Sequence, residues 1–150
     1  MKSFVVDASV VVEFLVPGRH TEGADKVLGT LAAENPADLL APDIILLEVA
    51  NALRKIVARR LISPAEGGQA IADVSRLAIH RVESAALLEG VWSLRHRMSA
   101  YDASYVTLGA LLDLPVISAD RKLVVAARDA GVGAWALDDD ELERVLGPTG

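Results

Sequence analysis

Four acidic residues stand where an alternating α/β fold would bring them together. Asp7 and Asp120 each follow an apolar run, whereas Glu48 and Asp102 lie in segments with a helical pattern. Carboxylates that share one cleft repel each other unless cations lie between them. Hard oxygen ligands of this kind suit Mg²⁺ or Mn²⁺. The four acids therefore predict metal-dependent chemistry on phosphodiester bonds.

Each acid also has a purely structural explanation. Asp7 and Asp120 stand where they would cap the helices that follow them. Asp102 lies three residues after Ser99, the spacing of a capping box. Glu48 is harder to explain as a surface residue, because an apolar run precedes it and a partly buried carboxylate needs a partner. A bound metal ion would be such a partner.

Polar and basic residues near the acids are candidates for supporting roles. Ser9 follows Asp7 by two residues, and Asn51 lies one helical turn beyond Glu48, although both also suit ordinary capping or surface positions. Four cations are candidates for contacts with the phosphates that flank a metal site: Lys55, Arg59, Arg121 and Lys122. A solvated helix face is their ordinary role. The histidines lack the spacing of a zinc site, and Tyr101 and Tyr105, four residues apart, are predicted to share a helix face and to pack.

Composition limits the class of protein. With 150 residues, 52% of them hydrophobic, the chain is expected to form a single domain over residues 1–150. It has no cysteine, which excludes disulfides and thiolate metal sites. We predict a cytoplasmic protein without a membrane span, because no signal peptide or long apolar stretch is visible. The net charge of −6 is unusual for a nucleic-acid-binding protein, but bound cations would change the local charge.

Strand-like apolar runs alternate with longer helical patterns, which predicts a parallel sheet with helices on both faces. The predicted strands are Ser3–Val6, Leu39–Ala41, Ile79–Val82, Pro115–Ser118 and Val132–Leu137. The predicted helices are Ala8–Leu15, Thr21–Ala33, Asp43–Arg60, Ser63–Ala78, Ser84–Arg97, Tyr101–Leu112 and Arg121–Asp129, with a short helical turn in Asp138–Glu143. Ligands of such folds bind beyond the carboxyl ends of the strands, where Asp7 and Asp120 are expected.

Four segments together resemble the PIN-domain ribonucleases, and within them the VapC toxins of bacterial toxin–antitoxin pairs. They are Val5-Val6-Asp7-Ala8-Ser9, Glu48-Val49-Ala50-Asn51, Ser99-Ala100-Tyr101-Asp102-Ala103-Ser104-Tyr105 and Ile117-Ser118-Ala119-Asp120. Their order and approximate spacing are those of the family, and the resemblance covers nearly the whole chain. The Tyr-Asp-Ala-Ser-Tyr run is the most specific part.

The resemblance implies a three-layer α/β/α sandwich with a central parallel sheet. It implies Asp7, Glu48, Asp102 and Asp120 as the catalytic and metal-binding acids, with Asp120 the least constant of the four in the family. Ser118 keeps a hydroxyl where relatives often carry threonine. It also implies a Mg²⁺- or Mn²⁺-dependent endoribonuclease that cleaves structured RNA at an exposed single-stranded loop. A VapB-type antitoxin and a homodimer are the expected partners.

Other functions fit parts of the pattern. A haloacid-dehalogenase-like phosphatase would use Asp7 as a nucleophile, but Ser9 stands where its second acid is needed. A receiver-like phosphoacceptor domain would need paired acids after the first strand, where Val6 precedes Asp7. An inactive PIN scaffold that only binds a partner is a third alternative, against which the four intact acids argue.

Overall fold

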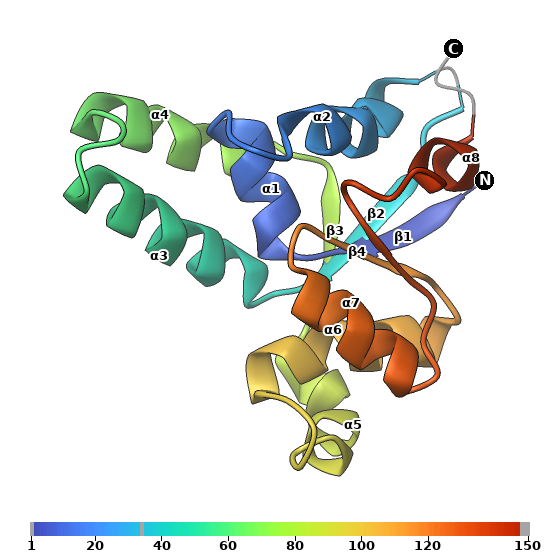
Figure 1. Ribbon diagram of the computed structural model, residues 1–150. Coiled ribbons are helices and arrows are strands. Elements are labelled where there is room, and N and C mark those ends of the chain that lie inside the picture. Colours follow the sequence, from blue (N-terminus) through green and yellow to red (C-terminus); the bar gives the residue numbers. More distant parts are fainter. Residues whose placement is uncertain (1, 34, 148–150) are drawn as a thin grey trace.

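The computed structural model of the chain describes residues 2–33 and 35–147. Five strands form one sheet in the order β3-β2-β1-β4-β5, and every neighbouring pair is parallel (Figure 1). Their bounds are Ser3–Val6 for β1, Asp38–Pro42 for β2, Ile79–Val82 for β3, Val116–Ser118 for β4 and Ala134–Ala136 for β5. The predicted parallel sheet is confirmed.

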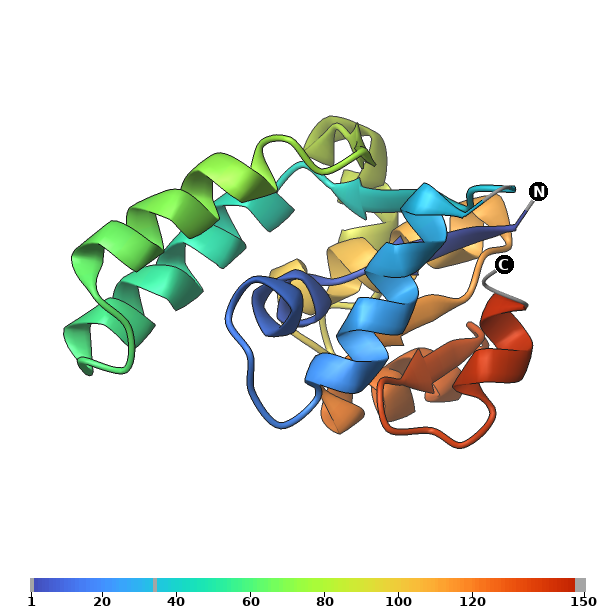
Figure 2. The ribbon, with the colours of Figure 1, turned by 90° about the horizontal axis from the view of Figure 1, so that it is seen from above.

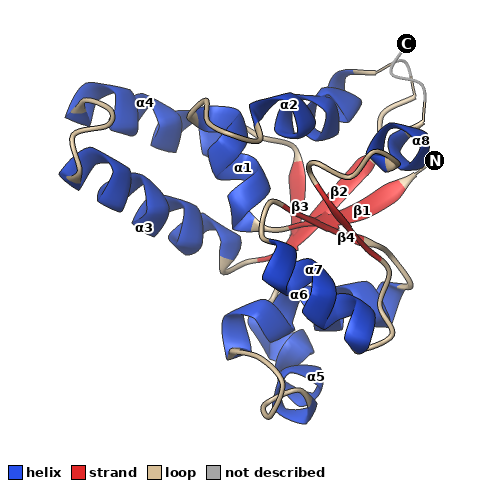
Figure 3. Cartoon of the chain, in the orientation of Figure 1, coloured by secondary structure: helices blue, strands red, loops and turns tan. Residues whose placement is uncertain are grey.

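Helices flank the sheet, as Figure 3 shows. The α-helices are α1 (Ala8–Leu15), α2 (Thr21–Gly29), α3 (Ile45–Ala58), α4 (Pro64–Val74), α5 (Leu88–Ser93), α6 (Ala100–Leu112), α7 (Arg121–Asp129) and α8 (Leu142–Leu146). Helix α6 packs against β1, β2 and β4, while α7 packs against β4 and β5 and α1 packs against α2 and α3. Because crossovers between parallel strands are right-handed, α1 and α2 cover one face and α6 and α7 the other. The predicted three-layer sandwich is confirmed.

The order of the strands reverses beside β1. The chain adds β2 and then β3 on one side of β1, and afterwards adds β4 and β5 on the other side. Val6 is in register with Ile117 of β4, and the backbone N–H of Asp7 donates to the carbonyl oxygen of Ile117 at 3.2 Å. In open α/β sheets, a ligand crevice forms at the carboxyl ends of the two strands where the order reverses. Asp7 stands at this crevice.

Helices α3 and α4 form an antiparallel arm that extends away from the sheet (Figures 1 and 2). The arm turns at Ser63, whose hydroxyl accepts from the backbone N–H of Glu66 at 3.1 Å, while the Glu66 carboxylate accepts from the N–H of Ser63 at 3.0 Å. This capping box was predicted from the sequence and is confirmed. The N-terminal end of α3 lies beside the crevice, and Glu48 is in the first turn of this helix.

Four predicted helices differ clearly from the structure, and one of them, predicted as Ser63–Ala78, begins as expected but ends at Val74. Ser84–Arg97 is a 3₁₀ turn over Ser84–Leu87 followed by the short helix α5, which ends at Ser93, where the Arg95 guanidinium donates to the carbonyl oxygen of Trp92 at 3.0 Å. Thr21–Ala33 changes from α2 to a 3₁₀ turn at Thr30, whose buried hydroxyl donates to the carbonyl oxygen of Val27. The last helix is Leu142–Leu146, later than the predicted turn in Asp138–Glu143, and within that predicted turn Asp139 accepts from the N–H of Ala136.

The core is built mainly from Val, Leu and Ala side chains, as the low aromatic content predicts. Val5, Val6, Val10 and Val11 are fully buried, which accounts for the unbroken apolar run around Asp7. Within residues 2–33 and 35–147, no helix combines the length and the apolar character that crossing a membrane requires.

Candidate active site

One cleft at the crevice is lined by all four predicted acids, Asp7, Glu48, Asp102 and Asp120. Its volume is about 440 Å³, and its wall also includes Ser9, Glu13, Asn51, Lys55 and Tyr105. The side chains come from the end of β1, from α1, α3 and α6, and from the turn between β4 and α7. Residues more than 110 positions apart in the sequence thus meet where the strand order reverses.

Asp7 is the buried end of the cleft, with an exposed fraction of 7%. The Ser9 hydroxyl donates to Oδ1 at 2.5 Å, and the Ser118 hydroxyl donates to Oδ2 at 2.7 Å. Burial raises the pKa of Asp7 to about 6, because desolvation outweighs these hydrogen bonds. Oδ1 also accepts a long bond of 3.4 Å from the N–H of Val10, so Asp7 caps α1 as well as lining the cleft.

The two serine hydroxyls join Asp7 to the turn between β4 and α7. Ser118 Oγ accepts from the N–H of Asp120 at 2.9 Å while it donates to Asp7. Ser9 Oγ accepts from the N–H of Ala119 at 2.9 Å. Each hydroxyl therefore uses its hydrogen for Asp7 and an oxygen lone pair for the turn. Ser9 and Ser118, which the sequence predicts as supporting residues, thus lie between Asp7 and the turn that carries Asp120.

Glu48 is half-buried and is oriented by a tyrosine. The Tyr105 hydroxyl donates to Glu48 Oε1 at 2.7 Å, and Tyr105 is only 1% exposed. Desolvation raises the pKa of Glu48, and the charge on Asp102 adds to this effect. The prediction that Tyr105 only packs is therefore incomplete. The prediction that Tyr101 packs is wrong, because Tyr101 is 60% exposed.

Sequence spacing carried a signal for two residues that we did not predict. Tyr105 lies three residues after Asp102 on α6, a separation that places both side chains on one helix face. Glu13 likewise lies four residues after Ser9 on α1. Its carboxylate lines the cleft and accepts from the N–H of His20 at 3.1 Å.

Asp102 and Asp120 begin the helices that approach the cleft. Ser99 caps α6 by accepting from the N–H of Asp102 at 3.2 Å. Burial raises the pKa of Asp102, and the charge on Asp120 raises it further. Asp120 is exposed, and its Oδ1 caps α7 by accepting from the N–H of Lys122 at 2.9 Å. Capping and a place in the cleft are therefore compatible for Asp120.

The predicted phosphate-binding cations have different surroundings. Lys55 lines the cleft together with Asn51, whose Oδ1 accepts two bonds from Arg54. Arg59 is exposed at the C-terminal end of α3 and does not line the cleft. Arg121 forms an ion pair with Asp138 at 2.7 Å, and the Lys122 side chain is exposed.

The donor set of the cleft fits a hydrated divalent ion. Four carboxylates are hard oxygen ligands, and the pKa values of three of them are raised, mainly by burial and further by a neighbouring carboxylate. Among residues 2–33 and 35–147, no three or more His, Cys, Asp or Glu side chains are gathered closely enough to form a metal site by themselves. Mg²⁺ keeps several waters and uses few direct carboxylates, so a shared cleft rather than a closed cage suits it.

The chain is similar to known proteins over most of its length. Residues 4–129 match the model of the PIN domain family. A VapC ribonuclease of Mycobacterium bovis is 35% identical over 119 residues, which cover 79% of this chain and 87% of the relative. Ribonuclease VapC1 of Mycobacterium tuberculosis is 36% identical over 127 residues, which cover 84% and 92%.

Two solved structures share the fold. The crystal structure of PAE2754 from Pyrobaculum aerophilum superposes with a TM-score of 0.69 at 21% identity, covering 96% of this chain and 89% of that one. The crystal structure of VapBC2 from Rickettsia felis, bound to a DNA fragment from their promoter, gives a TM-score of 0.64 at 13% identity, covering 89% and 98%. At these identities, the likeness extends to the fold alone.

Proposed function

The chain belongs to the PIN-domain family, among the VapC ribonucleases, and from this premise we propose that it is the endoribonuclease toxin of a toxin–antitoxin pair and that it requires Mg²⁺ or Mn²⁺. The observation that supports this most directly is the convergence of four carboxylates on one cleft. Family membership leaves no place for the phosphatase and receiver alternatives. An inactive PIN scaffold remains the alternative to test.

The buried side of the cleft supplies oriented negative charge. Asp7, Glu48 and Asp102 would hold the ion, directly or through water, and Asp120 would take part at the exposed side. When bound, the ion would polarise a phosphoryl oxygen and lower the pKa of a water molecule. Ser9 and Ser118 fix both oxygens of Asp7, and Tyr105 fixes Glu48, so little reorganisation is needed before reaction.

The exposed side of the cleft is where RNA would approach. Lys55 lines the cleft from α3 and is exposed, which suits a contact with a phosphate next to the scissile bond. Lys122, in the first turn of α7, is a second candidate. A structured RNA with an unpaired loop is the proposed substrate, because unstacked bases and a flexible backbone can enter an open cleft.

The proposed protein partners are a VapB-type antitoxin and a second copy of the chain. One solved structure with the same fold is that of VapBC2 from Rickettsia felis bound to a DNA fragment from their promoter. The arm of α3 and α4 exposes apolar side chains, including Leu61 at 70% and Ile71 at 41%. These side chains are available for a protein partner.

RNA cleavage by the purified protein tests the proposal. The wild-type protein should cleave a mixture of structured RNAs in Mn²⁺ or Mg²⁺, and EDTA should stop the reaction. Asp7→Asn protein, purified in the same way, controls for contaminating nuclease. Cleavage that persists in EDTA would overturn the metal requirement, and no cleavage by folded wild-type protein with either metal would favour the inactive scaffold.

A further inference from the structure

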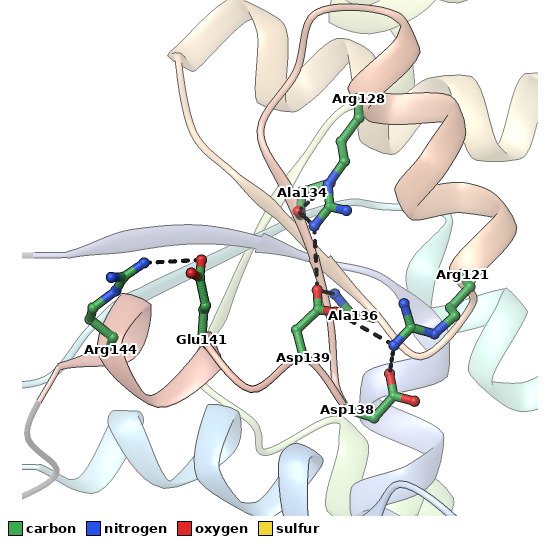
Figure 4. Close-up of polar contacts among 8 residues, drawn as sticks. All are labelled: Arg121, Arg128, Ala134, Ala136, Asp138, Asp139, Glu141 and Arg144. Atoms are coloured by element: carbon green, nitrogen blue, oxygen red, sulfur yellow. Dashed lines mark hydrogen bonds and ion pairs between the residues drawn. The ribbon is translucent and has the colours of Figure 1, made fainter.

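A network of charged side chains joins α7 to the end of β5 (Figure 4). One Arg121 nitrogen, Nη2, lies 2.7 Å from Asp138 Oδ1 and 3.5 Å from Asp139 Oδ1. Asp139 is itself held, because its Oδ2 accepts from the N–H of Ala136 at 2.7 Å and lies 3.3 Å from Arg128 Nη2. We call Arg121, Asp138 and Asp139 the Arg121 clamp.

The clamp is attached to the end of the sheet at β5. Arg128 donates two hydrogen bonds to the carbonyl oxygen of Ala134, at 2.9 and 2.7 Å. The N–H of Leu137, just after β5, donates to the carbonyl oxygen of Ser118 at 3.1 Å. The acids of the clamp therefore follow a strand that is bonded to β4, and Asp139 has only 18% of its side chain exposed.

Asp120 is the residue that this attachment affects. It precedes Arg121 directly and caps α7, so any shift of the first turn of α7 moves its carboxylate. On its other side, the N–H of Asp120 is held by Ser118, which also holds Asp7. Ser118 thus connects Asp120 to Asp7, and the clamp connects the residue after Asp120 to the end of β5.

We propose that Arg121 is a positioning residue, which fixes the exposed carboxylate of Asp120 for metal binding, rather than a contact to RNA. This inference rests on the metal site of the proposed function. The Arg121 side chain is 59% exposed, yet one of its nitrogens is shared by two carboxylates. An isolated exposed ion pair contributes little to stability, so its loss is not expected to unfold the protein.

The variant Arg121→Ala distinguishes a positioning role from a purely electrostatic effect, because the two predict opposite changes in Mn²⁺ affinity. Removing a positive charge beside a group of carboxylates should by itself strengthen Mn²⁺ binding. Loss of positioning should weaken Mn²⁺ binding and lower kcat by about 10-fold, as changes behind a metal ligand commonly do. The KM for RNA should stay the same. Mn²⁺ titration by calorimetry gives the affinity without any reaction.

Two further variants complete the test. Arg121→Lys keeps the charge but not the planar fork, so it should recover only part of the Mn²⁺ affinity. Asp138→Asn should reduce kcat in the wild type and have no further effect in Arg121→Ala, since the bond is already lost. Arg144→Ala removes a comparable exposed ion pair, to Glu141 at 3.0 Å, and should change neither quantity.

A different result would identify Arg121 as an RNA contact. In that case Arg121→Ala would raise KM with unchanged Mn²⁺ affinity, and Asp138→Asn would lower KM by releasing the guanidinium. The calorimetric result does not depend on cleavage. If wild-type protein bound Mn²⁺ but cleaved no RNA, the proposed function would fail while the clamp could still be confirmed or overturned.

Discussion

Asp7 and Asp120 have the same local setting and different surroundings. Each follows a parallel strand, and each caps the next helix by accepting a backbone N–H, from Val10 and from Lys122 respectively. Asp7 is 7% exposed and its pKa is raised to about 6, whereas Asp120 is an exposed residue at the rim of the cleft. One sequence motif therefore produces a buried ligand candidate at one strand and an exposed one at the next.

The position of each strand in the sheet explains the difference. Strand β1 is central, with β2 and β4 as neighbours, and α1 leaves it under the cover of α2 and α3. The turn after β4 lies towards the edge strand β5, where the side chains of Arg121 and Asp138 are exposed. Burial raises the pKa of Asp7, whereas the carboxylate of Asp120 is exposed and the residue that follows it, Arg121, forms surface ion pairs.

The largest expected effect is the loss of RNA cleavage when Asp7, rather than Asp120, is replaced. Asp7→Asn should lower RNA cleavage by more than about 100-fold, the upper range for changes outside the first ligand shell. A neutral amide of nearly the same shape cannot balance a divalent cation. Cleavage assays with matched amounts of folded protein measure this change. Wild-type activity in Asp7→Asn would remove Asp7 from the site.

The second prediction concerns pH and stability without metal. The pKa of Asp7 rises from its ordinary value of 3.8 to about 6 on folding, so the folded protein holds this proton more tightly than the unfolded chain. The free energy of unfolding should therefore fall as pH increases from about 4 to about 6, by about 3 kcal/mol. Urea denaturation in EDTA measures it.

The matched variant for this pH effect is Asp7→Asn, which has no titrating group at the position. Its unfolding free energy should fall less over the same pH range, since only the raised pKa values of Glu48 and Asp102 contribute with the same sign. If the unfolding free energies of the variant and the wild type had the same dependence on pH, the raised pKa of Asp7 would be contradicted.

The third prediction tests the exposed acid. Asp120→Asn should keep the cap of α7, because Asn caps helices as well as Asp does, and should change stability by less than about 0.5 kcal/mol. Cleavage should decrease, but less than for Asp7→Asn, because Asp120 joins the site only at its rim. Thermal unfolding and cleavage of the two variants are compared directly. An equal loss in both would make the buried and exposed acids equivalent.

The smallest effect is expected for RNA contacts on α3. Lys55→Ala should weaken RNA binding and lower the salt slope by about 0.7, the value for one phosphate contact on a single strand. Arg59→Ala, a matched loss of one cation on the same helix, should have a smaller effect, because Arg59 lies outside the cleft. RNA titrations at several salt concentrations measure both. If both variants lowered the salt slope equally, the RNA would contact Arg59 as well as Lys55 and would therefore follow α3 beyond the cleft.

The sequence alone predicted the parallel sheet and the approach of the four acids to one another, because local patterns indicate the strands and helices that carry them. An unbroken apolar run before Asp7 indicates a strand buried on both faces, and the Ser63 capping box indicates the start of a helix. The early end of α5 and the role of Tyr105 were missed. No cap residue in the sequence marks the end of α5, and the role of Tyr105 depends on a hydroxyl that donates to Glu48 of another helix, 57 residues away in the chain.

The sequence by itself determined which residues have the chemistry for this site. They are four carboxylates, the hydroxyls close to them in the sequence, and a lysine on the same helix as Glu48. The tertiary structure decided how those residues differ. The order of the strands placed Asp7 at the covered centre of the sheet and Asp120 at its open side, and it turned Arg121 towards Asp138 and Asp139. Burial and ion pairing depend on what packs against a residue, and segments distant in the sequence supply those neighbours.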